Sequence, residues 1–235
     1  MGSASPGLLT AVGIPVWVPT REDLGSSFRD ASLKSGSGDP GPRRSTRLSE
    51  ADVFRIFMNS STNEAVVVAN GYLSRRAFWC RDLSTNFYML GSMGLALSIG
   101  LGVALAQPRR RVAVIDGDGN LLMSAGALVM AGRMAPPNLM HIVIDNRQYA
   151  STGGQASISG SVNMSLLARA AGYRISSEVG NEAQLSEALE ELRAADGPSF
   201  LRVLVTAGIE VSPRVLRSPE EIARTFKKSI APDET

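Results

Sequence analysis

The sequence predicts an α/β fold in which a parallel β-sheet is covered by helices on both faces. From Ser49 onwards, short apolar segments alternate with segments of helical periodicity, as they do in parallel sheets whose strands are joined by crossover helices. The strand segments are nearly all apolar instead of alternating between apolar and polar residues, which indicates that both of their faces are buried. With 44% apolar residues among 235, the chain has enough side chains for a sizeable core.

The individual elements are placed by their periodicity and by their ends. Ser49, with Asp52 three residues later, is a candidate N-cap of the first helix, and Ser218 followed by Pro219 starts the last helix. Gly172 is a stop signal for a short helix that precedes it. The expected strands are 64–70, 110–116, 138–146, 173–179 and 199–206, and the expected helices are 49–59, 91–107, 121–134, 163–172, 182–195 and 218–230.

Residues 1–47 differ in composition from the rest of the chain. Twenty of them are Gly, Ser or Pro, and the segment 35–45, SGSGDPGPRRS, is typical of a flexible linker. Before this linker, 13–19 could form a strand and 20–33 could form a helix capped by Thr20. We therefore expect three parts: an N-terminal extension over 1–34, a linker over 35–47 and a folded domain over 48–235.

Composition and charge argue against several classes of function. The formal net charge is only +2, so nothing indicates nucleic-acid binding. No long apolar run predicts a membrane span, and the N-terminus lacks the basic start and apolar run of a secretory signal. The single cysteine excludes an internal disulfide, and we expect a cytoplasmic protein. Cys80 and the single histidine, His141, are both expected to be packed side chains without a catalytic role.

The most informative motif is Gly117-Asp118-Gly119, which joins an expected strand to an expected helix. Glycines let the backbone turn sharply and approach a ligand closely, and a helix N-terminus favours an anion. Because the motif also supplies a carboxylate, a cation shared between that carboxylate and a phosphate would explain the combination, and Mg²⁺ has this preference. A second oxygen ligand is expected at the end of the next strand, where Asn146 stands 28 residues after Asp118.

This arrangement resembles the diphosphate-binding domain of thiamine diphosphate enzymes, whose pattern is Gly-Asp-Gly followed at a similar interval by Asn. A bare Gly-Asp-Gly also occurs in ordinary turns, but the added Asn on a neighbouring strand end is much more specific. The resemblance implies that Asp118, Asn146 and the main-chain carbonyl of Gln148 hold Mg²⁺, and that Mg²⁺ holds the cofactor diphosphate.

The resemblance extends to the segment NFYMLGSMG (86–94). It implies that the Gly91 carbonyl accepts from the 4′-amino group of the aminopyrimidine and that Met93 lies under the bent cofactor, bringing the 4′-nitrogen close to C2 of the thiazolium. A core methionine on a helix face is the alternative for Met93. The cofactor-binding residues implied in total are Gly91, Ser92, Met93, Gly94, Gly117, Asp118, Gly119, Asn120, Asn146 and Tyr149.

A narrower resemblance, over about residues 50–230, is to sulfopyruvate decarboxylase β subunits and to the corresponding half of phosphonopyruvate decarboxylases. Its selective motifs are SRRAF (74–78), NFYMLGSMG (86–94) and STGGQ (151–155). The chain departs from that family at Arg76, Ala150 and Gly154, which lie near the expected substrate side.

Several residues are candidates for contact with an anionic substrate. Arg75, Arg76 and Arg81 follow the first strand and could meet such a substrate, but a solvated basic edge is an equal alternative. Ser151 and Thr152 could bond the diphosphate or the substrate, or could belong to a plain loop. Of these residues, Arg75, Ser151 and Thr152 are the expected substrate contacts.

The resemblance also implies a partner. Thiamine diphosphate catalysis needs a glutamate at N1′ of the pyrimidine, which this family carries on a separate pyrimidine-binding domain. The chain is too short for both domains, so we expect a hetero-oligomer in which an α-type subunit supplies that glutamate and this chain supplies none. The segment 8–32 is similar to the last strand and helix of such a domain, and an unstructured leader is the alternative.

Three functions follow, and the sequence leaves them open. The first is the β-type subunit of a decarboxylase acting on a small 2-oxo acid, phosphonopyruvate- or sulfopyruvate-like, with thiamine diphosphate and Mg²⁺. The second is a carboligase subunit in which an acceptor captures the same carbanion, as in acetolactate synthases. The third is a non-catalytic cofactor-binding subunit, which the intact expected ligand set disfavours.

Overall fold

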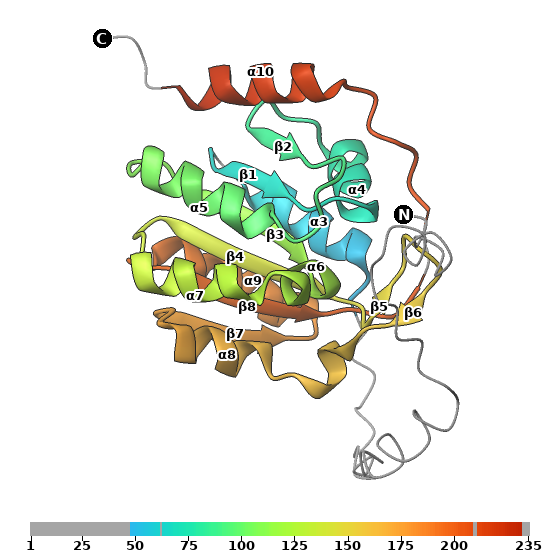
Figure 1. Cartoon of the computed structure of the whole chain (residues 1–235), viewed down its shortest axis with the longest axis vertical. Helices are drawn as coiled ribbons and strands as arrows, with labels where there is room; N and C mark the ends of the chain where they lie inside the picture. Colours follow the sequence, from blue (N-terminus) through green and yellow to red (C-terminus); the bar gives the residue numbers. More distant parts are fainter. Residues whose placement is uncertain (1–47, 62, 209–210, 232–235) are drawn as a thin grey trace, which may run out of the picture. The chain divides into compact units, whose positions relative to one another are not determined.

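The structure, a computed structural model, describes residues 48–231 except 62, 209 and 210. Six strands of this part of the chain form one sheet in the order β2-β1-β3-β4-β8-β7, and every pair in it is parallel. The sheet strands are β1 (Ala65–Val68), β2 (Asn86–Tyr88), β3 (Val112–Gly117), β4 (Leu139–Asp145), β7 (Ile175–Val179) and β8 (Ser199–Leu204). The predicted parallel α/β fold is confirmed (Figure 1).

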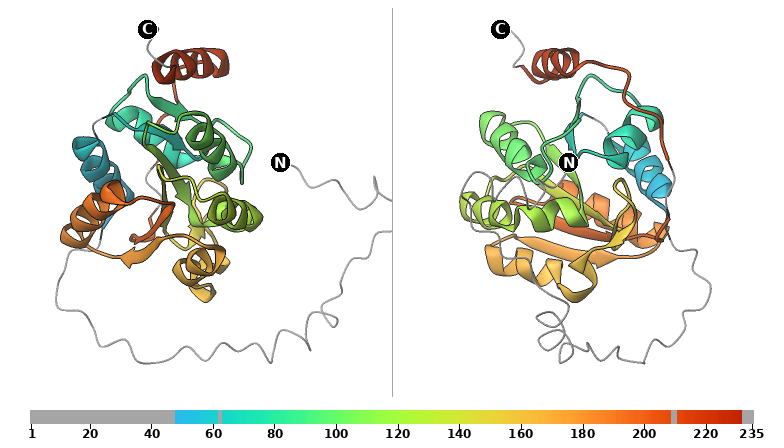
Figure 2. Two further views of the ribbon diagram at one scale, coloured as in Figure 1. Left: turned by 90° about the vertical axis from the view of Figure 1, so that its left-hand side faces the viewer. Right: turned by 45° about the vertical axis from the view of Figure 1, so that its right-hand side comes forward.

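Helices cover both faces of the sheet, as the left view of Figure 2 shows. One face carries α3 (Glu50–Ser60), α4 (Tyr72–Cys80) and α9 (Glu182–Ala194). The other face carries α5 (Ala96–Ala106), α7 (Ala125–Met134) and α8 (Met164–Ala171), with the short α6 (Asp118–Met123) at the end of β3. Helix α10 (Pro219–Ile230) packs against the edge strand β2.

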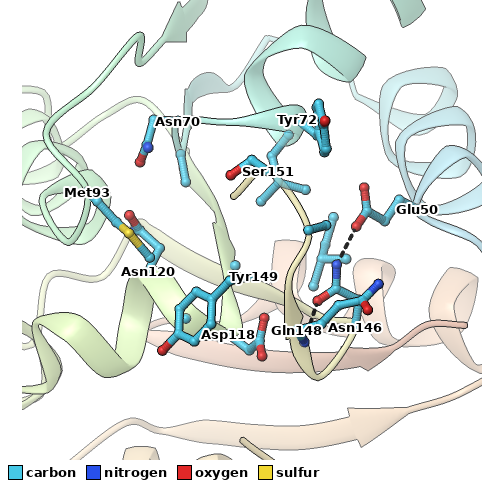
Figure 3. Close-up of a pocket in the computed structure, with 16 residues that line it drawn as sticks. Glu50, Asn70, Tyr72, Met93, Asp118, Asn120, Asn146, Gln148, Tyr149 and Ser151 are labelled. Atoms are coloured by element: carbon cyan, nitrogen blue, oxygen red, sulfur yellow. Dashed lines mark hydrogen bonds between the residues drawn. The ribbon is translucent and has the colours of Figure 1, made fainter. Parts of the chain in front are cut away.

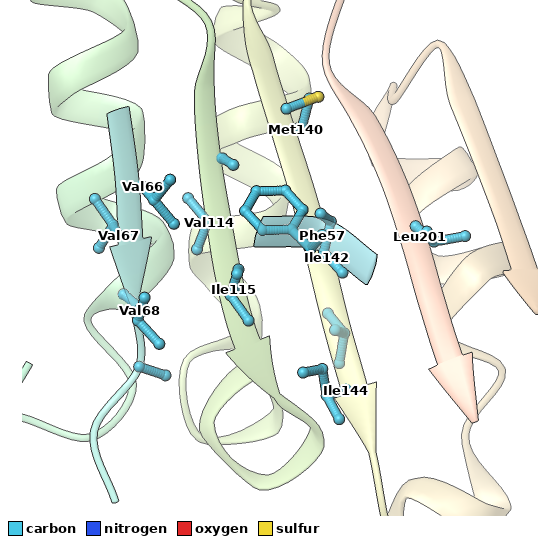
Figure 4. Close-up of a cluster of buried hydrophobic side chains, with 14 of the residues drawn as sticks. Phe57, Val66, Val67, Val68, Val114, Ile115, Met140, Ile142, Ile144 and Leu201 are labelled. Atoms are coloured by element: carbon cyan, nitrogen blue, oxygen red, sulfur yellow. The ribbon is translucent and has the colours of Figure 1, made fainter. Parts of the chain in front are cut away.

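The core lies between these layers. Every residue of β1 and of β4 is buried, and so are the first five residues of β3. Figure 4 shows their valine, isoleucine and methionine side chains together with Phe57 from α3. The strands are apolar throughout because both of their faces meet helices.

Local end signals act as expected. The Ser49 hydroxyl accepts from the Asp52 backbone N–H, and the Asp52 carboxylate accepts from the Ser49 backbone N–H, which completes a capping box for α3. Ser218 and Glu221 form the same motif at α10, with Pro219 in the first position. Gly172 ends α8 in a left-handed conformation, with φ of 105°.

Two of the expected helices have different bounds. The segment 91–107 is helical only from Ala96, because Ser92 (φ 57°) and Gly94 (φ 92°) have left-handed backbones that a right-handed helix excludes. The expected helix 121–134 starts earlier, at Asp118, and is broken at Ser124, which separates α6 from α7.

Other elements were not expected. These are α4, β2, the hairpin of β5 (Gln148–Tyr149) with β6 (Gln155–Ala156), and the short 3₁₀ helix η1 (Ile158–Ser161). The expectation that Cys80 is packed is wrong, because this residue ends α4 on its exposed side. His141 is a core residue as predicted, with no exposed surface.

Some expectations are not addressed by the part of the chain described. The strand over 13–19, the helix over 20–33 and the linker over 35–47 lie outside the described residues. Within the described residues, no helix has the length and apolar character that crossing a membrane requires.

The strand order places a switch point beside β1. Strand β1 has β2 on one side and β3 on the other, and the helices that follow β1 and β3 cover opposite faces of the sheet. Loops that leave the carboxyl ends of such strands diverge and open a crevice between them, which is the usual ligand position in an open α/β sheet.

Candidate cofactor-binding site

A pocket lies at this switch point (Figure 3). Its walls come from the ends of β1, β3 and β4, from the first turn of α3, and from the β5–β6 hairpin. The lining residues expected from the sequence to bind cofactor, metal or substrate are Met93, Gly117, Asp118, Gly119, Asn120, Asn146, Gln148, Tyr149 and Ser151. These residues come from three segments that lie apart in the sequence, at 93, 117–120 and 146–151.

The Gly-Asp-Gly turn is shaped by close packing. β3 ends at Gly117 and α6 begins at Asp118. No side chain caps this helix start, so the first backbone N–H groups of α6 are available to another acceptor. A Cβ atom on Gly119 would lie 2.3 Å from the Tyr149 ring, so only glycine fits beneath that ring. The glycine therefore lets the turn lie directly against Tyr149, which lines the same pocket.

Asp118 is a buried carboxylate that forms no ion pair with a side chain of the described residues. It is 3% exposed, and no ion pair among the described residues includes it. Burial raises the pKa of its carboxyl above the ordinary value, the Asp145 carboxylate raises this pKa further, and the hydrogen bond that the Ser157 hydroxyl donates lowers it. A bound cation would compensate this charge, so the donor set fits a metal ion.

Asn146 has its amide oriented by the protein. Its Nδ2 donates to Glu50 Oε1 at 2.9 Å, and its Oδ1 accepts from the Gln148 backbone N–H at 3.0 Å, as drawn in Figure 3. Glu50 Oε2 also lies 3.5 Å from Arg76 Nε in a mostly buried ion pair. Because Glu50 can only accept, the amide nitrogen must face it, and the amide oxygen is left for the pocket side.

The described residues contain no cluster of three or more His, Cys, Asp or Glu side chains that could hold a metal ion. The expected set has one carboxylate, one amide oxygen and one main-chain carbonyl. Such a set suits Mg²⁺, which takes few protein ligands and completes its shell with water and substrate phosphates.

A second polar network supports the loop that carries Asn146. The Asp145 carboxylate accepts from Arg202 Nε at 2.8 Å, from Ser159 Oγ at 2.8 Å and from the Arg147 backbone N–H at 2.9 Å. The Ser159 backbone N–H donates to Ser157 Oγ at 3.2 Å, and the Ser157 hydroxyl donates to Asp118. The two strand ends that carry the expected metal ligands are therefore tied together through Ser159 and the half-buried Ser157.

The turn over 91–94 lies beside the pocket. Met93 lines the pocket and lies near Asn120 in Figure 3, whereas Gly91 and Ser92 line a neighbouring, more apolar hollow with residues of β2 and α10. Gly94 donates its backbone N–H to Asn120. Met93 is therefore a pocket residue and not a core methionine.

Only one of the three expected substrate contacts lines the pocket. Ser151 lines the pocket, but Thr152 is exposed and bonds to the Tyr149 carbonyl and to Gln155. Arg75 lies over the Tyr72 ring at 5.3 Å and donates to the Ser212 carbonyl at 3.4 Å, and it is not among the lining residues.

The other two arginines of the first strand's end have structural partners. Arg76 is 8% exposed and pairs with Glu50, whereas Arg81 is exposed and donates to the Met58 carbonyl at 2.7 Å. Because Arg76 is buried, the three arginines do not together form a solvated basic edge.

Sequence reasoning missed three polar residues of the lining, Glu50, Asn70 and Tyr72. Asn70 Oδ1 is buried and has no hydrogen-bond partner among the described residues, so a polar ligand would satisfy it. The sequence could have indicated Asn70, because it stands between the end of β1 and Gly71, a glycine with φ of 86°. Glu50 gave no local signal, because it reaches Asn146 from 96 residues away.

Comparisons with known proteins agree with this geometry. The model of the family "Thiamine pyrophosphate enzyme, C-terminal TPP binding domain" matches residues 69–203. The chain is 35% identical over 222 residues to a phosphonopyruvate decarboxylase of Streptomyces viridochromogenes, covering 94% of this chain and 55% of that protein. It is 40% identical over 168 residues to a sulfopyruvate decarboxylase subunit beta of Methanothermobacter thermautotrophicus, covering 72% of this chain and 88% of that protein.

A solved structure shows the same fold. The thiamine diphosphate-dependent 4-hydroxybenzoylformate decarboxylase of Rhodococcus jostii superimposes with a TM-score of 0.62 at 22% identity, over 74% of this chain and 36% of that one. The chain spans about half the length of the phosphonopyruvate decarboxylases that it matches, and most of the length of the β subunit.

Proposed function

Because this chain belongs to the family of thiamine pyrophosphate enzymes, we propose that it is the β-type subunit of a two-component thiamine diphosphate-dependent decarboxylase. The observation that carries the proposal is Asp118, a buried carboxylate without a cationic partner among the described residues, at the floor of a pocket that the Gly-Asp-Gly turn and Asn146 share. The similarity to a β subunit over most of that protein's length supports the division into two components.

In this proposal Asp118, the Asn146 amide oxygen and the Gln148 carbonyl hold Mg²⁺, and Mg²⁺ holds the diphosphate. Asp118 supplies the charge, and Glu50 keeps the Asn146 amide in the orientation that offers oxygen to the metal. The backbone N–H groups at the start of α6 face the anionic group.

The turn over 91–94 is proposed to hold the aminopyrimidine. The Gly91 carbonyl accepts from its 4′-amino group, and Met93 supports the bent conformation from below. When bound, thiamine diphosphate supplies the electron-accepting ring that decarboxylation of a 2-oxo acid needs. Met93 fixes the geometry on which this chemistry depends, which is an effect of orientation rather than of acid–base chemistry.

A partner subunit is proposed to supply the glutamate for N1′ of the pyrimidine. Glu50 is the only glutamate among the described residues that line the pocket. Its carboxylate accepts a hydrogen bond from Asn146 and forms an ion pair with Arg76. It therefore serves the metal side of the site and not the pyrimidine. We propose an α-type subunit with a pyrimidine-binding domain, in a hetero-oligomer whose cofactor lies at the subunit interface.

The proposed substrate is a small anionic 2-oxo acid of the phosphonopyruvate or sulfopyruvate type. The support is the similarity to enzymes of those names, together with Ser151 at the pocket and Arg75, which lies over the ring of the lining residue Tyr72. A cytoplasmic location is part of the same proposal, since a reducing compartment keeps the exposed Cys80 as a thiol.

The test mixes the purified chain with a pyrimidine-domain subunit. We expect no decarboxylase activity from this chain alone, activity after mixing with thiamine diphosphate and Mg²⁺, and a shared elution position in size-exclusion chromatography. Association should tighten with the cofactor, because a ligand that binds the complex stabilises it. Sulfopyruvate and phosphonopyruvate are assayed separately, with and without an aldehyde acceptor, so that a carboligase is recognised by its products. Full activity from the chain alone would overturn the two-component proposal.

A further inference from the structure

A buried side-chain bridge connects the Gly-Asp-Gly turn to the turn that carries Met93. Asn120 Oδ1 accepts from the Gly94 backbone N–H at 2.6 Å, and Asn120 Nδ2 donates to Asp116 Oδ1 at 2.5 Å. Asp116 Oδ2 lies 3.2 Å from His141 Nε2. The Asn120, Asp116 and His141 residues are 5%, 1% and 0% exposed, so water does not compete for these bonds.

The orientation of the Asn120 amide is determined by its partners. The Gly94 backbone N–H can only donate, so the amide oxygen of Asn120 must face it, which leaves Nδ2 to donate to Asp116 Oδ1. Asp116 Oδ1 also accepts from the Gly117 backbone N–H at 2.8 Å. His141 presents Nε2 to the other Asp116 oxygen, and its Nδ1 has no hydrogen-bond partner in the part of the chain described.

The turn that receives this bridge has an unfavourable backbone. Ser92 has φ of 57° and Gly94 has φ of 92°, and Met93 lies between them. Non-glycine residues in the left-handed region persist only where surrounding contacts hold them. Within the turn, the Leu95 N–H bonds to the Ser92 carbonyl at 3.2 Å, and the Asn120 contact joins it to α6.

We infer that Asn120 is a positioning residue: it fixes the Met93 turn against the Gly-Asp-Gly turn, with its amide oriented by Gly94 and Asp116. This rests on the proposed function, in which the two turns hold opposite ends of one cofactor. The side chain of Asn120 then sets the separation of the diphosphate end from the aminopyrimidine end. Its polar atoms are already engaged by Gly94 and Asp116, so its role toward the cofactor is indirect.

The first test compares Asn120→Ala with Asn138→Ala. Asn138 is a matched control, because it is also a 5% exposed asparagine, and its Nδ2 donates to the carbonyls of Ala104, Gln107 and Arg110 at the other end of the strands. Amide hydrogen exchange is measured on the full chain without cofactor, for the peptide over 91–95. Thiamine diphosphate affinity and kcat are measured on the assembled complex with Mg²⁺.

We expect Asn120→Ala to speed exchange over 91–95 by about three- to tenfold, the factor that one hydrogen bond is worth. We expect kcat to fall on the order of 100-fold, as for a misplaced reacting group, with a much smaller loss of cofactor affinity. Asn138→Ala should lower the unfolding midpoint without changing exchange over 91–95 or kcat. Unchanged exchange over 91–95 in Asn120→Ala, or an equal change in both variants, would overturn the inference.

The second test exchanges the two side chains. Asn120→Asp sets a second carboxylate against Asp116 and should loosen the turn. Adding Asp116→Asn restores one donor facing one acceptor between the two side chains, although the bond that Asp116 Oδ1 accepts from the Gly117 backbone N–H is lost. We expect the double variant to recover part of the exchange protection and part of the kcat that Asn120→Asp loses. No recovery would contradict a role for amide orientation. A wild-type complex that binds no thiamine diphosphate would instead contradict the proposed function, because the exchange measurements do not involve the cofactor.

Discussion

Two glycines of α5 should respond in opposite ways to the same substitution. A Cβ atom on Gly100 would lie 2.1 Å from Val114 Cγ2, whereas a Cβ atom on Gly102 has nothing within 4 Å. Both positions are inside the helix, where alanine is favoured over glycine by about 0.5–1 kcal/mol. Gly102→Ala should therefore raise the free energy of unfolding by about that amount.

Gly100→Ala gains the same helix preference for alanine but also has a steric cost. Ordinary contacts begin near 3.4 Å, so α5 would have to move away from β3 by about 1 Å, since the buried, β-branched Val114 has little freedom to rotate. Overpacking of this kind costs about 1–3 kcal/mol. The difference between the two variants isolates this cost, so Gly100→Ala should be less stable than Gly102→Ala by about 1–3 kcal/mol.

Urea denaturation of the isolated chain measures both variants. The midpoints should move in opposite directions while the slope stays constant, because the surface exposed on unfolding is unchanged. Since α5 starts directly after the turn over 91–94, Gly100→Ala should also lower turnover in the complex. Equal stability of the two variants would refute the contact between Gly100 and β3, and with it the register of α5 on the sheet.

Three further predictions concern the site and the first helix. Asp118→Ala should weaken the binding of thiamine diphosphate with Mg²⁺ by more than about 100-fold in calorimetric titration, and Asn146→Ala should act in the same direction more mildly; unchanged affinity in Asp118→Ala contradicts the metal assignment. Met93→Ala should lower kcat on the order of 100-fold while most of the cofactor affinity remains, and a loss confined to binding argues against its supporting role. Hydrogen bonds from Ser49 hold the pKa of the Asp52 carboxyl below its usual 3.8, so its stabilisation is present above that pH and is lost as pH falls through the lowered value. Asp52→Asn should therefore reduce the unfolding midpoint at neutral pH and not in strong acid, and an equal loss at both pH values speaks against the capping box.

The sequence by itself determined the fold class and pointed to many of the residues that line the candidate site. Apolar strands such as β4 can be stable only between two layers of helices, so composition and periodicity together imply the parallel sheet. Gly-Asp-Gly and Asn146 each follow a strand, and parallel strands bring their carboxyl ends to one edge. Ser49 and Ser218 are capping signals that act within four residues and need no tertiary contact.

Only the tertiary structure decided which side chains complete and support the site. Glu50 orients Asn146 across 96 residues, and Asn120 bonds Gly94 across 26. The start of α5 at Ala96 and the exposure of Cys80 depend likewise on how the turn and α4 pack. The physical reason is range: periodicity and capping arise from neighbours along the chain, whereas burial and the partner of a polar group depend on which distant segments the fold brings beside it.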